Sequence, residues 1–192
     1  MILPGLRVGL QEWAVCARAL AEGKVCLIVR KGGIHEPKGG LFKPEHDRFV
    51  LLPSYLHQQP DRLLPAFRGD ILAQSAANPV PGKIPVSAWA EVAQVWKVED
   101  LARVQALGDE LMWTSDELAA RFSYRSQPWL YVLALRTHRL GAAVDIHDHP
   151  SYAGCRSWIS LTDPIRTDGS TPAIPDAAFA ERLARIGGVL TR

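Results

Sequence analysis

The sequence lacks the features that would assign it to a membrane, secreted or disulfide-rich class. No apolar run approaches the roughly 18 residues that a transmembrane helix needs. Pro4 and Gly5 interrupt the apolar start, where a signal peptide would need a continuous hydrophobic segment. The 3 cysteines are an odd number without C-x-x-C spacing, so we expect reduced thiols. We therefore expect a cytoplasmic protein that does not enter a membrane.

The chain also lacks a strong net charge and the common catalytic motifs. Its 22 Lys and Arg against 20 Asp and Glu leave a formal charge of +2, which gives no strong case for nucleic-acid binding. There is no G-x-x-x-x-G-K-[ST] phosphate loop and no G-x-S-x-G nucleophile motif. The apolar segment 24–30 carries no acid and segment 86–98 only Glu91, which disfavours a restriction-type nuclease core. Motifs alone assign no reaction and indicate no cofactor or metal.

Basic residues are nevertheless unevenly distributed. Residues 121–144 hold four arginines and no acidic residue, and residues 24–43 hold five basic residues against one acid, Glu36. If the fold brings these two segments together, they create a local positive field.

Hydrophobic periodicity predicts an α+β protein. Apolar residues at i, i+3, i+4 and i+7 predict a helix over 9–22, and Thr114 followed by Glu117 predicts a capping box that opens another helix. Strands are predicted at 24–30, 49–55, 86–98, 128–140 and 155–161, and further helices at 60–78, 99–107 and 176–188. We expect one domain over 1–192 with a proline-rich connector at 78–85. Its single mixed sheet of about five strands would be flanked by an N-terminal helix, a middle helical segment and a C-terminal helix.

The first candidate site follows the predicted strand 24–30. Arg30 and Lys31 supply positive charge, and Gly32 and Gly33 allow backbone N–H groups to approach a ligand closely. Arg136 ends another predicted strand in the same way. These five residues predict a phosphate- or carboxylate-binding site. The alternative is a basic strand end followed by a tight turn.

The second candidate site combines histidines with carboxylates. His46 and His57 flank the predicted strand 49–55, and Glu45 and Glu36 lie near them in sequence. Histidine titrates near neutral pH and a carboxylate can orient it, so the set predicts general acid–base chemistry. The alternative is a hydrogen-bonded polar rim around a strand.

Two weaker motifs favour ordinary structural roles. The His147-x-His149 pair beside Asp145 has the ligand types that zinc accepts, but its spacing fixes no third ligand and Pro150 indicates an exposed loop. Cys155 after a glycine could serve as a nucleophile if a base were near, whereas most single cysteines are inert packing residues.

Several blocks of the chain resemble a known family. They comprise Glu12-Trp13, residues 30–36 with Phe42, and residues 45–58, 129–136 and 152–158. Together they resemble DUF1802, a set of bacterial and archaeal proteins of unknown function. The resemblance carries over no catalytic role, and the occurrence of some relatives beside restriction-type nuclease domains favours nucleic acid.

Two functions remain open from the sequence. The first is a nucleic-acid or nucleotide phosphate-handling protein, with hydrolysis by the His and carboxylate groups. The second is a non-catalytic module that binds a small anion or a protein partner through the same residues.

Overall fold

The computed structural model describes residues 5–31, 43–76, 80–154 and 156–191, and their strands form one mixed sheet. The strands are β1 Leu6–Trp13, β2 Leu27–Arg30, β3 Arg48–Ser54, β4 Lys83–Val98, β5 Leu130–His147, β6 Trp158–Ile165 and β7 Thr171–Pro172. Their order is β2-β5-β4-β3-β1-β6, with β7 paired to β5. β1 runs parallel to β3, whereas the other pairings are antiparallel. The predicted mixed sheet is confirmed, with 7 strands rather than about five.

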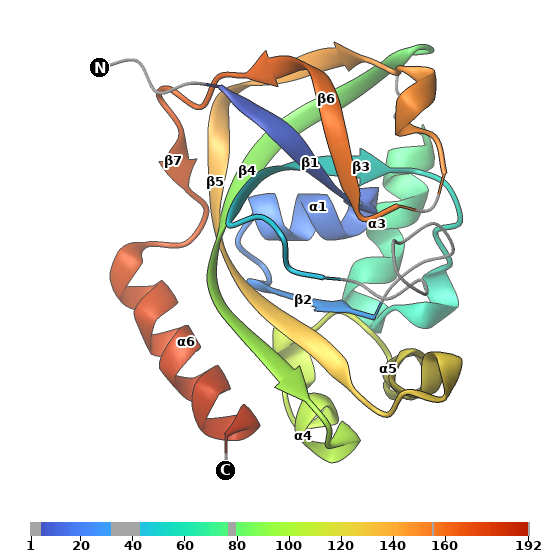
Figure 1. The fold of residues 1–192 in the computed structure, drawn as a ribbon, viewed down its shortest axis with the longest axis vertical. Coiled ribbons are helices and arrows are strands. Elements are labelled where there is room, and N and C mark those ends of the chain that lie inside the picture. The colour runs from blue at the N-terminus through green and yellow to red at the C-terminus, as the bar shows by residue number, and fades with distance from the viewer. Residues whose placement is uncertain (1–4, 32–42, 77–79, 155, 192) are drawn as a thin grey trace.

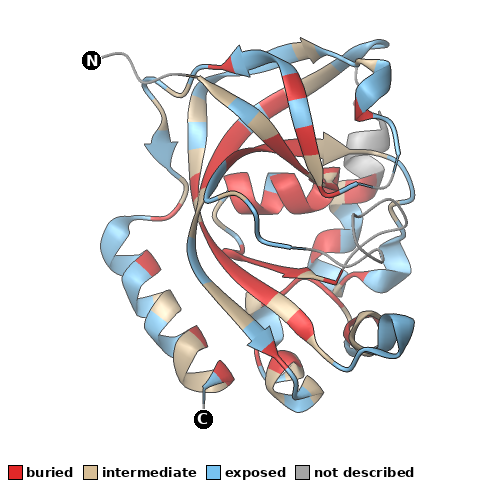
Figure 2. Cartoon of the chain, viewed as in Figure 1, coloured by how far each residue is buried: buried red, intermediate tan, exposed pale blue. Residues whose placement is uncertain are grey.

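The sheet curls around a short helix, α1 (Ala14–Ala21), which lies in its concavity (Figure 1). Every residue of α1 except Arg18 is buried, and Figure 2 shows this helix almost wholly in the colour of buried residues. Its alanine-rich sequence leaves room for β-sheet residues on several sides. Phe49 and Leu51 of β3 belong to the same core cluster as α1, while their neighbours Val50 and Leu52 belong to a second cluster on the other face.

The remaining helices lie outside this central helix. They are α3 Pro65–Ala76, α4 Leu101–Gln105, α5 Ser115–Ser123 and α6 Asp176–Leu190, with short 3₁₀ turns η1 Pro60–Arg62, η2 Gly108–Glu110, η3 Tyr124–Ser126 and η4 Pro150–Tyr152. α6 covers the side of β4 and β5 that faces away from α1 (Figure 1). Trp96 of β4 reaches it, since its indole lies 3.9 Å from the position that a Cβ of Gly187 would occupy.

Side-chain hydrogen bonds cap the N-terminal ends of two helices. The Thr114 hydroxyl accepts a hydrogen bond from the Glu117 N–H at 3.3 Å, so Thr114 caps the start of α5. The other half of the predicted capping box is not formed, because the Thr114 N–H donates to the Arg62 carbonyl at 3.0 Å and the Glu117 carboxylate contacts Arg121 and Arg62. Asp100 caps α4 in the same manner, accepting from the Ala102 N–H.

The predicted N-terminal helix begins later than expected. Residues 9–13 belong to β1, because they pair with β3 on one side and β6 on the other. The helix begins only at Ala14, so the prediction over 9–22 was wrong for its first third.

Three other boundaries also differ. β4 already begins at Lys83, inside the predicted 78–85 connector. β5 continues to His147, seven residues past the predicted strand end at 140, because it stays paired with β4. β6 runs over Trp158–Ile165 rather than 155–161. Among the described residues, no helix is long and apolar enough to cross a bilayer.

Candidate functional site

Arg30, at the end of β2, connects the two margins of the curled sheet. Its guanidinium lies 2.9 Å from a carboxylate oxygen of Glu12 on β1 and donates a second hydrogen bond to the Ser157 hydroxyl, just before β6. Both charged side chains are largely buried, Glu12 at 6% exposure and Arg30 at 14%. The loop before β6 is held by main-chain contact as well, because the Gln11 N–H donates to the Ser157 carbonyl at 2.8 Å. Arg30 therefore joins β2, β1 and the entry to β6.

Lys31, the next residue, turns toward a different part of the molecule. Its ammonium donates to the carbonyls of Phe122, Gln127 and Trp129, at 3.3 Å and 2.6 Å for the first and last, and lies 4.1 Å from the centre of the Trp129 ring. Three carbonyl acceptors match the three protons of an ammonium group. Burial lowers the pKa of Lys31, and the nearby positive charge of Lys97 lowers it further. Lys31 thus ties the segment after α5 to the end of β2.

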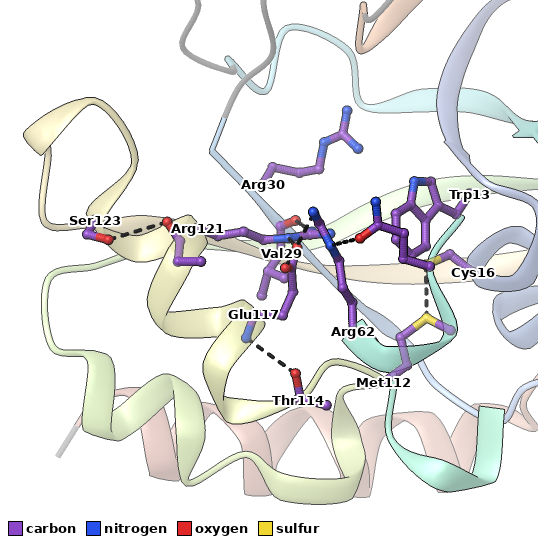
Figure 3. A network of polar contacts seen from close by, with 12 residues as sticks. Trp13, Cys16, Val29, Arg30, Arg62, Met112, Thr114, Glu117, Arg121 and Ser123 are labelled. Atoms are coloured by element: carbon purple, nitrogen blue, oxygen red, sulfur yellow. Dashed lines mark hydrogen bonds and ion pairs between the residues drawn. The ribbon is translucent and has the colours of Figure 1, made fainter. Parts of the chain in front are cut away.

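Two further arginines converge on a carboxylate of α5. Arg121 lies 2.7 Å and Arg62 3.5 Å from the two oxygens of Glu117, which is 8% exposed (Figure 3). The Arg121 guanidinium also stacks 3.7 Å from the ring centre of Trp113 and donates to the Val29 carbonyl of β2 at 3.4 Å. α5 is thereby held against the same strand that carries Arg30 and Lys31.

These residues form a cluster with excess positive charge, which we call the β2-end cluster. Its members are Glu12, Arg30, Lys31, Arg62, Glu117 and Arg121. The three arginines pair with the two carboxylates, whereas Lys31 contacts only backbone carbonyls and a ring, so the six residues together carry a formal charge of +2. Such a local field attracts anions even though the protein as a whole is nearly neutral.

The predicted acid–base residues are only partly associated with this cluster. His46 contacts Trp158 edge-on, with ring centres 4.9 Å apart. Trp158 is the residue after Ser157, which Arg30 binds. Glu45 is exposed, and His57 is exposed in a turn with a positive φ of 62°. Of the described predicted residues, Arg30 and His46 therefore approach the same short segment, 157–158.

Arg136 lies on the other face of the sheet. Side chains alternate along β5, and Tyr131, the residue paired with Arg30, is five positions away, so Arg136 faces the opposite way. Its guanidinium binds the Ile174 carbonyl at 2.5 Å and Asp176, and lies 4.9 Å from the ring centre of Phe179 in α6. The structure thus does not bring Arg136 together with Arg30.

Other sequence candidates lie apart or outside the described part of the chain. Gly32, Gly33, Glu36 and Cys155 belong to residues that the structure does not describe. The His147 and His149 rings lie 6.4 Å apart, and the described residues contain no group of three or more His, Cys, Asp or Glu that could hold a metal.

The two described cysteines show no sign of reactivity. Cys16 and Cys26 are buried free thiols. Burial raises the pKa of Cys16 and raises that of Cys26 to about 11. Since the thiolate is the reactive form, both behave as small core residues.

Sequence reasoning missed the carboxylates and the serine that complete the cluster. Glu12 lies on a predicted helix, Glu117 is predicted only as a capping residue, and Ser157 occurs only within the family block 152–158, with no role attached. A charge signal does exist in the acid-free basic run at 121–144, whose Arg121 joins the β2 end.

The fold is a mixed sheet curled around one buried helix, with a cationic cluster where β2 ends. Residues 9–185 match the family model "Domain of unknown function (DUF1802)", and the chain therefore belongs to this family. The resemblance seen in the sequence blocks is thereby confirmed. No curated protein matches the chain.

Three solved structures of the ASCH protein from Zymomonas mobilis are weakly similar. A Tyr-to-Phe mutant is 12% identical, covers 93% of this chain and 96% of its own, and gives a TM-score of 0.48. A Ser-to-Ala mutant is 11% identical; the match covers 96% of this chain and 99% of the mutant's chain, with a TM-score of 0.46. A structure titled simply ASCH is 12% identical, covers 93% of both chains, and gives 0.42.

Proposed function

We propose that this protein binds the phosphate groups of a nucleic acid or nucleotide at the β2-end cluster. The observation that carries the proposal is that Arg30, Arg62 and Arg121 share only two carboxylates, Glu12 and Glu117, while Lys31 adds a fourth positive charge next to Arg30 in the chain. Three of the four cations are arginines, whose planar guanidinium groups suit phosphate oxygens.

The four cations take different parts in this proposal. Arg62 has a side chain that is 44% exposed, so a phosphate reaches it directly. Arg30 is 14% exposed and held by Glu12, and it serves as an inner, pre-oriented charge. Lys31 acts indirectly by positioning the segment that follows α5. Gly32 and Gly33 keep their predicted role as backbone donors. Arg136, which binds α6, does not enter the site.

Hydrolysis by Glu36, Glu45, His46 and His57 stays a prediction. It gains support from His46 alone, through its ring contact with Trp158 beside the cluster. The alternative is a non-catalytic module that takes a small anion or a protein partner at the same cluster.

Binding of fluorescein-labelled oligonucleotides, followed by anisotropy across a salt series, tests the proposal. We expect binding at low salt. The logarithm of the binding constant should fall linearly as log[salt] rises, because phosphate contacts release counterions. Arg62→Ala should weaken binding and reduce the slope of this plot by about one. Arg166→Ala is the matched control, because Arg166 is an exposed arginine paired with Asp168 far along the chain.

Absence of any oligonucleotide binding at low salt contradicts the proposal. Binding of inorganic phosphate or an acidic peptide without oligonucleotide binding supports the non-catalytic alternative instead.

A further inference from the structure

We infer that the ligand is a single-stranded nucleic acid whose bases stack on aromatic side chains beside the β2-end cluster. This inference rests on the proposed function and names its substrate class. The aromatic side chains are Trp129 and Tyr131, which with Arg30 and Lys97 form what we call the stacking face, and Tyr124, which lies in the segment leading to Trp129.

Sheet register places the stacking face next to the cluster. Tyr131 of β5 pairs with Arg30 of β2 on one side and with Lys97 of β4 on the other. Directly paired residues point to the same face of a sheet, so one aromatic ring lies between two cations. Because Trp96, the neighbour of Lys97, points toward α6, the stacking face is the side of the sheet turned away from α6.

Trp129 extends this row by one ring. Its ring centre is 5.1 Å from that of Tyr131 in an edge-on contact. Two ammonium groups flank it, Lys31 at 4.1 Å and Lys97 at 5.2 Å from its centre. Indole and phenol rings bordered by cations are the combination that holds a single strand, with rings for the bases and cations for the phosphates.

Tyr124 provides the most open ring. It is 36% exposed, and the Arg125 guanidinium lies 5.4 Å from its ring centre. Arg125 and Ser126, which follow it, have φ of 56° and 55°, a left-handed conformation that is unfavourable for residues other than glycine. Paired strain of this kind persists only where the surroundings fix it, and it recurs at ligand-binding sites. Here Lys31 fixes the segment through the carbonyls of Phe122 and Gln127.

The choice of a single strand over a duplex follows from the rings. A duplex keeps its base faces stacked internally and offers a protein mainly phosphates and groove edges. Exposed aromatic rings gain from bases only when those bases are unstacked. A cationic face without aromatic rings would bind the phosphates of a single strand and of a duplex alike.

The test compares two single strands of equal length and charge, one with bases and one abasic, and the corresponding duplex. Anisotropy is measured with a labelled single-stranded 12-mer (~12 nucleotides fits one binding surface), with the same backbone carrying abasic sites, and with the duplex. The base-containing strand should bind on the order of tenfold tighter than the abasic strand, because each stacked base adds binding energy. Tyr124→Ala should remove most of this preference and leave abasic binding unchanged, whereas Tyr124→Phe keeps it.

Val144→Ala is the matched control, because Val144 is a similarly exposed apolar residue (39%) elsewhere on β5. Equal affinity for the base-containing and abasic strands overturns the inference but leaves the proposed function standing. Equal weakening of both strands by Tyr124→Ala does the same. Failure of all three oligomers to bind at low salt defeats the proposed function itself.

Discussion

At the scale of single residues, the Glu12–Arg30 pair is the interaction on which the site depends. A buried ion pair gives up hydration on both sides, and it regains that energy only through good geometry and extra hydrogen bonds. Arg30 has these, since it also binds Ser157 and the Gln11 carbonyl, the latter at 3.4 Å. The pair orients the Arg30 guanidinium at the sheet margin. A shorter apolar residue at position 30 would not connect β2 to β1 and to the entry of β6.

Breaking this pair should destabilise the fold strongly. Replacement of one partner, in Arg30→Met or Glu12→Leu, leaves a buried charge without its counterpart, and we expect the free energy of unfolding to fall by about 3 kcal/mol. The double variant Glu12→Leu with Arg30→Met should lose less than the sum of the two. Urea unfolding of all three proteins checks this. Single variants that unfold at the wild-type midpoint would show that the pair contributes no net stability.

His138 gives the protein a pH-dependent stability. It lies stacked on Trp89, with ring centres 4.2 Å apart, and contacts Glu91 at 3.1 Å. Burial lowers its pKa, Arg136 and Arg48 lower it further, and Glu91 partly opposes the shift. Because the folded pKa lies below the unfolded one, the unfolded state takes up the proton first as pH falls.

The stability that neutral His138 contributes is therefore present above the unfolded pKa and is lost as pH falls through the folded pKa. We expect the urea midpoint to drop as the pH falls below the unfolded histidine pKa of about 6.5, and to drop less in His138→Gln. An identical pH dependence of the two proteins would rule out His138 as the cause.

At the scale of elements, local chemistry predicted some segments and tertiary pairing decided others. The Thr114 cap of α5 acts within four residues, so the sequence alone predicts this start of the helix. The same is true of the charged end of β2 at Arg30. Residues 9–13 carry an apolar spacing that suits a helix, yet β3 and β6 provide hydrogen-bond partners on both sides and the segment becomes a strand. No local signal could reveal those partners.

In the candidate site too, local sequence predicts some residues and only the folded sheet brings in the others. Arg30 was predicted as a strand-end cation, but its companions Glu12 and Ser157 come from segments that only the curled sheet brings near. Arg136 looked equivalent in sequence, and the alternation of side chains along β5 sends it to the other face.

Lys31 contacts three carbonyls of the segment 122–129. Lys31→Met removes the ammonium that donates to these three carbonyls and leaves the carbonyls without that donor. The loss of stability should exceed that from removing a surface contact. We expect amide hydrogen exchange across 122–129 to accelerate in Lys31→Met. Lys97→Met is the control, because Lys97 flanks the same ring but is 46% exposed and pairs with Glu99. Equal exchange in both variants would contradict the anchoring role.

At the scale of the whole molecule, one arginine connects three distant parts of the chain. Arg182 of α6 lies 2.8 Å from Glu110 of η2 and donates to the carbonyls of Gly23 and Lys24, at 3.2 Å and 2.9 Å. These two carbonyls lie in the turn between α1 and β2, so α6 is attached to the core as well as to the sheet face. The stacking face lies on the opposite side of β4 and β5 from this attachment.

Arg182→Ala should therefore separate stability from binding. The side chain is only 18% exposed, and loss of its hydrogen bonds and ion pair should lower the free energy of unfolding by about 2 kcal/mol. If α6 unfolds together with the sheet, the urea midpoint falls while the m-value stays unchanged, because the same surface is exposed on unfolding. The oligonucleotide affinity should stay at the wild-type value, since the binding residues lie on the other face. A reduced m-value would mean that α6 detaches before the sheet unfolds, and a reduced affinity would mean that the two faces are coupled through β4 and β5.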